Sequence, residues 1–172
     1  MQRTSRRYSV ADVSAVVCTM NSASSIERCL ESLRRAGVGE VIVVDGGSTD
    51  GTVEIANRLS DMVLRDDGTG LGQARNIGIA AAQRPLILNF GSDNVLVPGS
   101  LDAMVARMSL TGSAIVGAVT RIEGDSYLAR SMDAYRLARY KPGPAHVVGT
   151  PTLIDGSTLR AHPYRPERRF SD

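Results

Sequence analysis

Between residues 13 and 111 the sequence alternates short apolar runs with segments of helical periodicity. The apolar runs lie at 13–18, 41–44, 61–65 and 85–90, and they are typical of buried strands. Each run is followed by turn-forming residues and then by a segment with apolar residues three and four positions apart. Four such β–α repeats predict an α/β fold, with a mostly parallel central sheet and helices on both faces.

A different set of elements is expected after residue 112. These elements are a longer strand over 114–122, a helix over 125–139, one or two short strands within 147–154 and a polar, arginine-rich tail from residue 161. The apolar positions of the helix are Leu128, Met132 and Tyr135. We expect residues 1–11 to form a flexible arm and residues 12–172 a single domain, because this length suits one domain.

Composition excludes several classes of function. The formal net charge of +2 is too small to indicate a nucleic-acid partner. Arginine provides 19 of the 20 basic residues, which suits phosphate binding but is explained equally well by a biased genome composition. Cys18 and Cys29 are expected to be buried free thiols in a reducing compartment. No apolar run approaches the roughly 18 residues of a membrane span, so we expect a cytoplasmic protein.

The segment 41–52, Val-Ile-Val-Val-Asp-Gly-Gly-Ser-Thr-Asp-Gly-Thr, combines a buried strand with a sharp turn. Asp45 ends the strand, and Asp50 is predicted to be the N-cap of a helix over 51–59. Open parallel sheets bind ligands at the carboxyl ends of their strands, which makes Asp45 a candidate site residue. The alternative is a plain strand–turn–helix connection with a capping aspartate.

Three further segments are candidates for chemistry. The loop 68–72 resembles a dinucleotide-binding loop, but Gln73 stands where G-x-G-x-x-G needs its last glycine, so a dehydrogenase is not favoured. Asp93, within Gly-Ser-Asp-Asn after the fourth strand, offers oxygen ligands that suit Mg²⁺ or Mn²⁺, and the alternative is an Asx-turn or helix cap. Arg75, at a helix start, suits a phosphate, and the alternative is a solvated arginine.

Taken together, these segments resemble family 2 glycosyltransferases, which have the GT-A nucleotide-sugar-binding fold. The segments that carry the resemblance are Val-Val-Cys-Thr-Met-Asn (16–21), Val-Val-Asp-Gly-Gly-Ser-Thr-Asp-Gly-Thr (43–52), Ala-Arg-Asn-Ile-Gly (74–78) and Gly-Ser-Asp-Asn (91–94) with Pro98. Residues 12 to about 108 match well, and Gly149-Thr-Pro-Thr152 resembles the acceptor-side region more loosely.

The resemblance implies roles for individual residues. The implied nucleotide-sugar contacts are Cys18, Thr19, Asn21, Asp45, Arg75, Ser92 and Asp93, and the implied acceptor-side residues are Gly149, Thr150 and Thr152. Asp93 matches the last metal-binding aspartate of the family's Asp-x-Asp signature, whose first aspartate is replaced by Gly91. The implied cofactor is Mg²⁺ or Mn²⁺, and the implied donor is a nucleotide diphosphate-sugar.

The implied reaction is an inverting transfer to an acceptor hydroxyl, in which a general base takes the hydroxyl proton. Asp172 is a candidate for this base, although the sequence is more typical of the front part of a longer protein whose base lies further on. The acceptor is expected to be a saccharide or a lipid-linked molecule. The protein would meet a lipid-linked acceptor at the inner face of the membrane through arginines of the tail. The alternative is that these arginines are simply solvated. They are Arg160, Arg165, Arg168 and Arg169.

Three alternatives stay open at this stage. A nucleotidyltransferase has a related sheet, but it would normally show a glycine-rich loop with a basic residue after the first strand, which residues 19–25 lack. A non-catalytic nucleotide-sugar-binding module is favoured by Gly91 and by the uncertain base. A retaining transferase is the third alternative, because related folds achieve both stereochemical outcomes.

Overall fold

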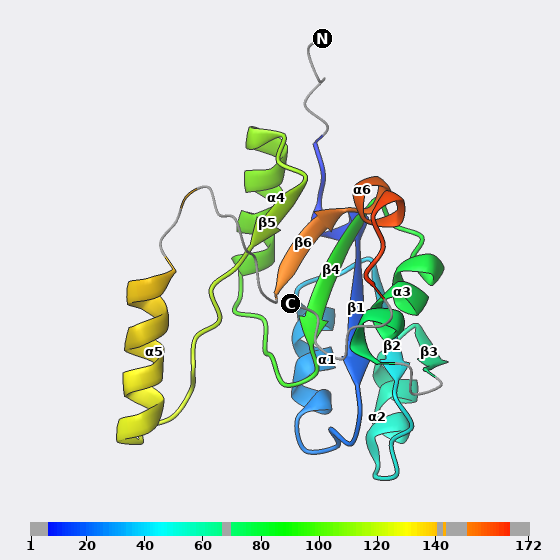
Figure 1. Ribbon diagram of the computed structural model, residues 1–172, viewed down its shortest axis with the longest axis horizontal. Helices are drawn as coiled ribbons and strands as arrows, with labels where there is room; N and C mark the ends of the chain where they lie inside the picture. Colours follow the sequence, from blue (N-terminus) through cyan, green and yellow to red (C-terminus); the bar gives the residue numbers. More distant parts are fainter. Residues whose placement is uncertain (1–6, 67–69, 141–142, 144–150, 166–172) are drawn as a thin grey trace.

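The structure, a computed structural model, describes residues 7–66, 70–140, 143 and 151–165. These residues form one six-stranded sheet in the order β3-β2-β1-β4-β6-β5 (Figure 1). The strands are β1 (Val13–Thr19), β2 (Glu40–Asp45), β3 (Met62–Arg65), β4 (Leu86–Gly91), β5 (Ile115–Gly117) and β6 (Thr152–Asp155). Among these strands β6 runs opposite to the other five, so the prediction of a mostly parallel α/β sheet is confirmed.

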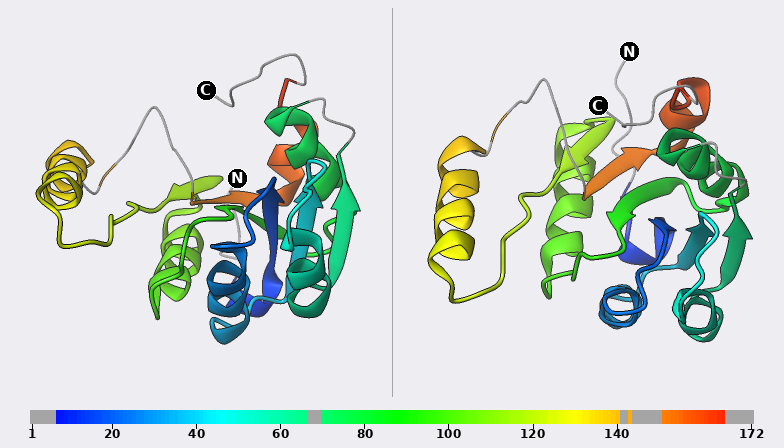
Figure 2. Two further views of the ribbon diagram at one scale, coloured as in Figure 1. Left: turned by 90° about the horizontal axis from the view of Figure 1, so that it is seen from below. Right: turned by 60° about the horizontal axis from the view of Figure 1, so that its bottom comes forward.

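The helices are α1 (Ile26–Arg35), α2 (Thr52–Leu59), α3 (Leu71–Ala81), α4 (Ser100–Thr111), α5 (Tyr127–Arg139) and α6 (Gly156–Ala161), with a short 3₁₀ turn, η1 (Val10–Asp12), before β1. All of these helices except α5 lie against the sheet, and they cover both of its faces, as predicted (Figure 2). In β1, Val13, Ala15 and Val17 face α1, α2 and α4, whereas Val16 faces α3 and α6. The strands are therefore apolar on both faces, which explains why their sequences are continuous apolar runs.

Helix α3 lies unusually close to the sheet. A Cβ at Gly78 would lie 2.5 Å from Cγ1 of Val16 and 3.1 Å from Cγ2 of Val44. Since real Cβ atoms do not approach other atoms so closely, only glycine fits at this position. The small residues of the segment 71–82 thus bring its first turn, and Arg75 with it, close to the ends of the central strands.

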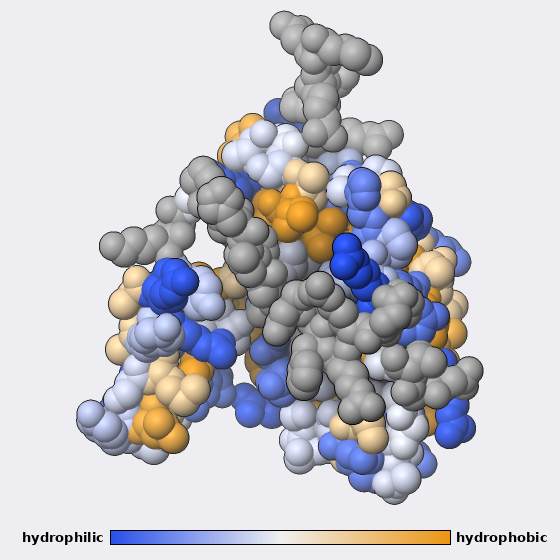
Figure 3. Space-filling model, viewed as in Figure 1, coloured by the Kyte–Doolittle hydropathy of each residue, from blue (hydrophilic) through white to orange (hydrophobic). Residues whose placement is uncertain are grey.

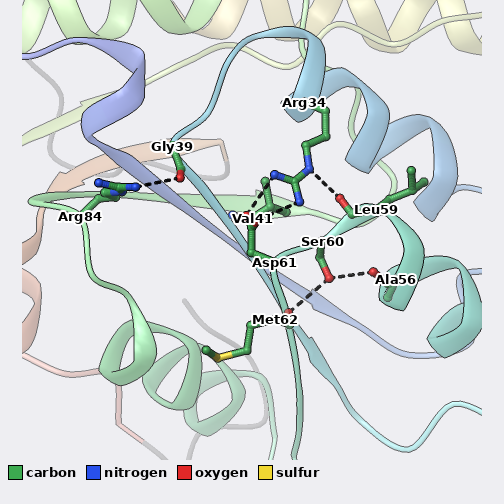
Figure 4. A network of polar contacts seen from close by, with 9 residues as sticks. All are labelled: Arg34, Gly39, Val41, Ala56, Leu59, Ser60, Asp61, Met62 and Arg84. Atoms are coloured by element: carbon green, nitrogen blue, oxygen red, sulfur yellow. Dashed lines mark hydrogen bonds and ion pairs between the residues drawn. The ribbon is translucent and has the colours of Figure 1, made fainter.

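The amino edge of the sheet, where the parallel strands begin, is held by a network of polar contacts (Figure 4). The Arg34 guanidinium on α1 donates to both carboxylate oxygens of Asp61, at 3.0 and 3.1 Å, and to the Leu59 carbonyl at 2.8 Å. Asp61 in turn accepts from the Val41 N–H at 2.7 Å. These contacts join α1, the end of α2 and the start of β2, far from the carboxyl edge.

The second half of the chain differs from its prediction. The strand expected over 114–122 is only the three-residue β5, and α6 was not expected at all. The predicted apolar positions of α5, Leu128, Met132 and Tyr135, are 68%, 46% and 66% exposed. This helix contacts the segment 121–124 before it rather than the sheet, and Figure 3 shows apolar and hydrophilic residues side by side on it.

The two ends of the described chain also make contacts with the body. Tyr8 and Val10, within the segment predicted as an arm, pack against the layer formed by α1, α2 and α4. Arg160, expected in the solvated tail, donates to the Ala82 carbonyl at 2.7 Å. Among the helices of the described residues, none has the length and apolar character that crossing a membrane requires.

Candidate functional site

The loops that follow β1, β2 and β4 lie side by side at the carboxyl edge of the sheet. Thr19 pairs with Asp45 across β1 and β2, and Cys18 pairs with Gly91 across β1 and β4. Asp93 follows Gly91 by two residues, so both candidate carboxylates, Asp45 and Asp93, belong to the same edge. The helices α1, α2 and α3 begin here, and their N-terminal N–H groups favour an anionic ligand.

Asp45 shapes the turn after β2. Its Oδ2 accepts from the N–H groups of Gly47 and Ser48, at 3.0 and 2.9 Å, and its Oδ1 accepts from the Ser48 hydroxyl. The residue is 5% exposed. Its carboxylate is thus engaged by the loop itself, and its first effect is to fix the backbone that any ligand at this edge would meet.

Asn21 fastens the loop after β1 to the loop after β2. It adopts φ of 51°, a left-handed conformation that asparagine tolerates better than most residues. Its N–H donates to the Ser48 hydroxyl at 2.8 Å, and its Oδ1 accepts from the Thr49 N–H at 2.9 Å. The two loops therefore form one polar wall.

Asp50 contributes to the same wall in a way that corrects the sequence prediction. The N-cap of α2 is Gly51, not Asp50, and the helix begins at Thr52. Asp50 accepts from the Thr52 N–H at 3.0 Å and from the Ala23 N–H at 3.1 Å, so its carboxylate bridges the two loops. The carboxylate thus keeps a capping contact with the Thr52 N–H through one oxygen and reaches residue 23 through the other.

The loop after β4 presents Asp93 beside the start of α1. The Ser92 hydroxyl lies 3.2 Å from the Ser22 hydroxyl, which joins this loop to the loop after β1. A Cβ at Gly91 would lie 2.8 Å from Oδ1 of Asp93 and 2.9 Å from Nδ2 of Asn94. The glycine that replaces the first acidic residue of the expected signature therefore leaves room that the Asp93 carboxylate occupies.

Cys29, on α1, packs under this loop. Its thiol donates to the Gly91 carbonyl at 3.4 Å. Burial raises the pKa of the Cys29 thiol to about 12, and the nearby Asp93 charge acts in the same direction. The thiol therefore stays protonated at neutral pH, and it supports the loop rather than acting as a nucleophile.

On the α3 face of the edge, Arg75 and Cys18 lie near an aromatic ring. The Arg75 Cζ is 5.2 Å from the centroid of the Tyr164 ring, a cation–π distance. Burial raises the pKa of the Cys18 thiol to about 12, and the Arg75 charge opposes this effect. The predicted nucleotide residues Cys18 and Arg75 thus share one environment, which Tyr164 covers.

Tyr164 and Asn89 were not predicted as site residues, and Asn76, which lies within the predicted segment 74–78, was given no role of its own. Asn76 bonds to both the N–H and the carbonyl of Tyr164, at 2.9 and 2.8 Å, and Asn89 Nδ2 donates to its hydroxyl at 2.7 Å. Burial raises the pKa of the Tyr164 hydroxyl. Asn89 could have been noticed in the sequence, because it is a polar residue within the apolar run 85–90. No feature of the local sequence distinguishes Tyr164.

Two buried oxygens at this edge have no hydrogen-bond partner among the described residues. They are Thr19 Oγ1 and Asn89 Oδ1, and both residues are at least nine-tenths buried. Leaving a buried acceptor unpaired costs about 1–3 kcal/mol, so such atoms are common where a ligand or water completes the site. Thr19 ends β1, whereas Asn89 lies two residues before the end of β4, paired with Val16 of β1 and Thr152 of β6.

Other predicted residues are placed as follows. Thr152 is buried at the start of β6, beside Asn89 and Gly117. Gly149, Thr150, Arg168, Arg169 and Asp172 lie outside the described residues. Within the described part of the chain, no three His, Cys, Asp or Glu side chains are grouped to hold a metal, so Asp93 would have to share one with oxygens of a bound ligand.

Comparison with known proteins identifies the family of this fold and site. The model of the family "Glycosyl transferase family 2" matches residues 14–169, and the chain therefore belongs to this family. The chain is 34% identical over 167 residues to the succinoglycan biosynthesis protein ExoO of Rhizobium meliloti, which covers 94% of this chain and 46% of that protein. It thus spans about half the length of this relative.

Solved structures of glycosyltransferases share the architecture. The mannosyltransferase PcManGT of Pyrobaculum calidifontis, in complex with GDP-Man and Mn²⁺, has a TM-score of 0.74 at 21% identity, covering 94% of this chain and 49% of that one. TarS 1-349 of S. aureus in complex with UDP-GlcNAc has a TM-score of 0.64 at 19% identity, covering 87% of this chain and 46% of that one. The predicted GT-A fold is confirmed by these similarities.

Proposed function

We propose that this chain transfers a sugar from a nucleotide diphosphate-sugar to an acceptor hydroxyl with inversion at the anomeric carbon. The observation that carries the proposal is the convergence of three polar loops, after β1, β2 and β4, on one edge of a family 2 fold. Nucleotide-sugars bound to PcManGT and to TarS support the choice of donor class.

The donor lies across this edge in our proposal. Its nucleoside contacts Cys18, Thr19 and Asn21, with Asp45 behind them. The Thr19 hydroxyl supports this assignment, because it is buried and has no hydrogen-bond partner in the described part of the chain, so a ligand or water would have to supply one. Arg75 meets the diphosphate by charge, and the Tyr164 ring beneath its guanidinium limits where that charge can move.

Asp93 would hold Mg²⁺ or Mn²⁺ together with diphosphate oxygens. The donor set fits such an ion, because Mg²⁺ in proteins is commonly bound by one or two carboxylates plus substrate phosphates and water. When bound, the ion neutralises the charge that develops on the leaving diphosphate. Asp93 in turn is positioned by the tight turn at Gly91 and by the Ser92–Ser22 contact.

The acceptor enters in this proposal from the side of Gly149, Thr150 and Thr152. Its hydroxyl attacks the anomeric carbon from the face opposite the diphosphate, and a general base takes the proton. Asp172 stays a prediction for that base. A positioned base contributes roughly 10²–10⁴ in rate, so its identity decides turnover but not donor binding.

The test compares Asp93→Ala with Asp102→Ala, the same substitution at an exposed position in the first turn of α4. Binding of UDP and GDP is measured by calorimetry with Mn²⁺ and again with EDTA. Because Asp93 would bridge the ion to the diphosphate, we expect its loss to weaken Mn²⁺-dependent binding at least about 10-fold. Asp102→Ala should bind like the unmodified chain, and with EDTA all three should bind alike.

Equal Mn²⁺-dependent affinity in Asp93→Ala and the unmodified chain would reject the metal assignment. A second measurement separates an enzyme from a binding module, an alternative favoured by the single carboxylate at Asp93. The unmodified chain is incubated with a panel of nucleotide-sugars, and release of nucleoside diphosphate is followed. Tight binding without release from any of them would favour the module.

A further inference from the structure

A cavity of about 220 Å³ lies next to Asp93, between β4, the first half of α4 and the segment 118–123. Its deepest lining residues are buried and apolar: Phe90, Leu101 and Met104 are 4%, 1% and 7% exposed. Val119, from the segment opposite, is 42% exposed and also lines it. The cavity therefore has an apolar floor and one flank open to solvent.

Apart from Asp93, the charged side chains of this cavity belong to its rim. Arg28 is paired with Glu123 at 3.1 Å, and their side chains are 65% and 80% exposed. Arg121, also at the rim, is paired with Asp133 of α5 at 2.6 Å. These charges are paired with one another, so the polar residues that remain in the lining are Asp93, Asn94, Ser100 and Thr120, beside a larger apolar surface.

The apolar floor and the charged rim determine which kind of ligand group the cavity can bind. A sugar ring placed on the floor would lose hydrogen bonds to water and gain few in return, at a cost of about 1–3 kcal/mol for each unpaired hydroxyl. An alkyl or aryl group would instead be stabilised by about 25 cal/mol for each Å² of apolar surface that it buries. The cavity is therefore suited to an apolar ligand group.

The position of the cavity connects it to the transfer site. In the sheet, β1 and β2 lie on one side of β4, where the nucleoside is proposed, and β6 and β5 lie on the other, toward the cavity. Asp93, at the end of β4, borders both regions. Pro151, adjacent to the predicted acceptor-side residues, also lines the cavity.

We infer that this cavity takes the apolar aglycone of the acceptor, so that the acceptor is an amphipathic glycoside with an alkyl or aryl group rather than a free saccharide. That the ligand is the acceptor of sugar transfer rests on the proposed function, whereas the apolar character of the ligand rests on the cavity alone. The reacting hydroxyl would then emerge near Asp93 while the apolar group stays on the floor.

Methyl NMR of ¹³C-methionine-labelled protein tests this inference directly. The chain has six methionines, and Met104 reports on the cavity floor. Three probes share one sugar: octyl, phenyl and methyl β-D-glucopyranoside, the octyl compound below its micelle concentration. We expect a saturable shift of the Met104 signal with the octyl or the phenyl probe, and none with the methyl probe. The stronger of the two responses distinguishes an alkyl from an aryl group.

A matched pair of variants controls for non-specific adsorption. Val119→Arg places a charge in the cavity, whereas Leu110→Arg makes the same change on the outer face of α4, where Leu110 is 84% exposed. Octyl or phenyl glucoside should bind at least about 10-fold more weakly to Val119→Arg and equally well to Leu110→Arg. The inference is overturned if Met104 fails to respond in the unmodified chain, responds equally to the methyl probe, or responds equally in Val119→Arg.

Titration of UDP and GDP with Mn²⁺ on the same samples separates the two proposals. Nucleotide binding without any Met104 response rejects the apolar cavity site and leaves the proposed function intact. A specific Met104 response without nucleotide binding has the opposite meaning: it supports an apolar ligand site and rejects its role in sugar transfer.

Discussion

At the amino edge of the sheet the Asp61 carboxylate meets the Arg34 guanidinium, whereas at the carboxyl edge the Asp45 carboxylate meets only uncharged donors of its own loop among the described residues. Both carboxylates accept backbone N–H groups. Asp61 ties together three elements, and its side chain is 46% exposed. Asp45 is buried and shapes a single turn.

The two edges also differ in what they leave unpaired. Among the described residues, the buried side-chain oxygens without a partner are on Thr19, at the carboxyl end of β1, and on Asn89, two residues before the carboxyl end of β4. The amino edge is therefore suited to stabilising the fold, and the carboxyl edge to binding a ligand. Substitutions at the amino edge should therefore change the free energy of unfolding alone, whereas substitutions at the carboxyl edge should change ligand binding as well.

The largest effect is expected from Asp45→Ala. The substitution leaves the N–H groups of Gly47 and Ser48 and the Ser48 hydroxyl without their acceptor, in a buried turn. We expect the free energy of unfolding to fall by about 2–3 kcal/mol in urea denaturation. Calorimetry at a temperature where the variant is folded should show weaker UDP or GDP binding as well. Unchanged nucleotide affinity would mean that the turn is only structural.

A smaller effect is expected from Asp61→Asn. Asparagine keeps one acceptor for the Val41 N–H but loses the charge that pairs with Arg34. Because the ion pair is well exposed, the free energy of unfolding should fall by only about 1 kcal/mol. Nucleotide affinity should stay the same within error. A change in that affinity would show that the two edges are coupled, and it would break the comparison.

The smallest effect is expected in how the difference in unfolding free energy between the unmodified chain and Asp61→Asn depends on pH. Burial raises the pKa of Asp61, but hydrogen bonds from Arg34 and Val41 outweigh it and hold the pKa below its ordinary value of 3.8. A carboxylate with a lowered folded-state pKa stabilises the protein above its unfolded pKa and loses that effect as pH falls through the folded pKa. The stability difference between the unmodified chain and Asp61→Asn should therefore be constant from pH 7 to 5 and shrink below about pH 4. A difference that grows on acidification would contradict the assignment.

The sequence predicted the first half of this fold well because its signals are local. Apolar runs, turn residues and helical stripes determine each β–α unit between residues 13 and 111, whereas the order of the strands in the sheet was not predicted. The second half depends on tertiary contacts. The stripe of Leu128, Met132 and Tyr135 has helical spacing, yet spacing does not say whether a partner covers it, and here the sheet does not.

The candidate site shows the same limit. Asp45 and Asp93 could be predicted to share an edge because each ends a strand of a parallel sheet. The Tyr164 ring over Arg75 joins residues 89 positions apart, and no local pattern predicts it. Likewise, one oxygen of the Asp50 carboxylate accepts from the Thr52 N–H, as a capping side chain does, but the other accepts from the Ala23 N–H, a contact that no local pattern predicts.

The insertion of β6 between β4 and β5 has a consequence for biosynthesis. In the described sheet, β5 hydrogen-bonds only to β6, so residues 115–117 have no strand to join until residues 152–155 have left the ribosome. The parallel strands β1 to β4 can pair as they emerge from the ribosome. By contrast, β5 can join the sheet only after β6 has emerged and paired with β4. A nascent chain arrested before residue 152 should therefore expose the flank of β4 to chaperones.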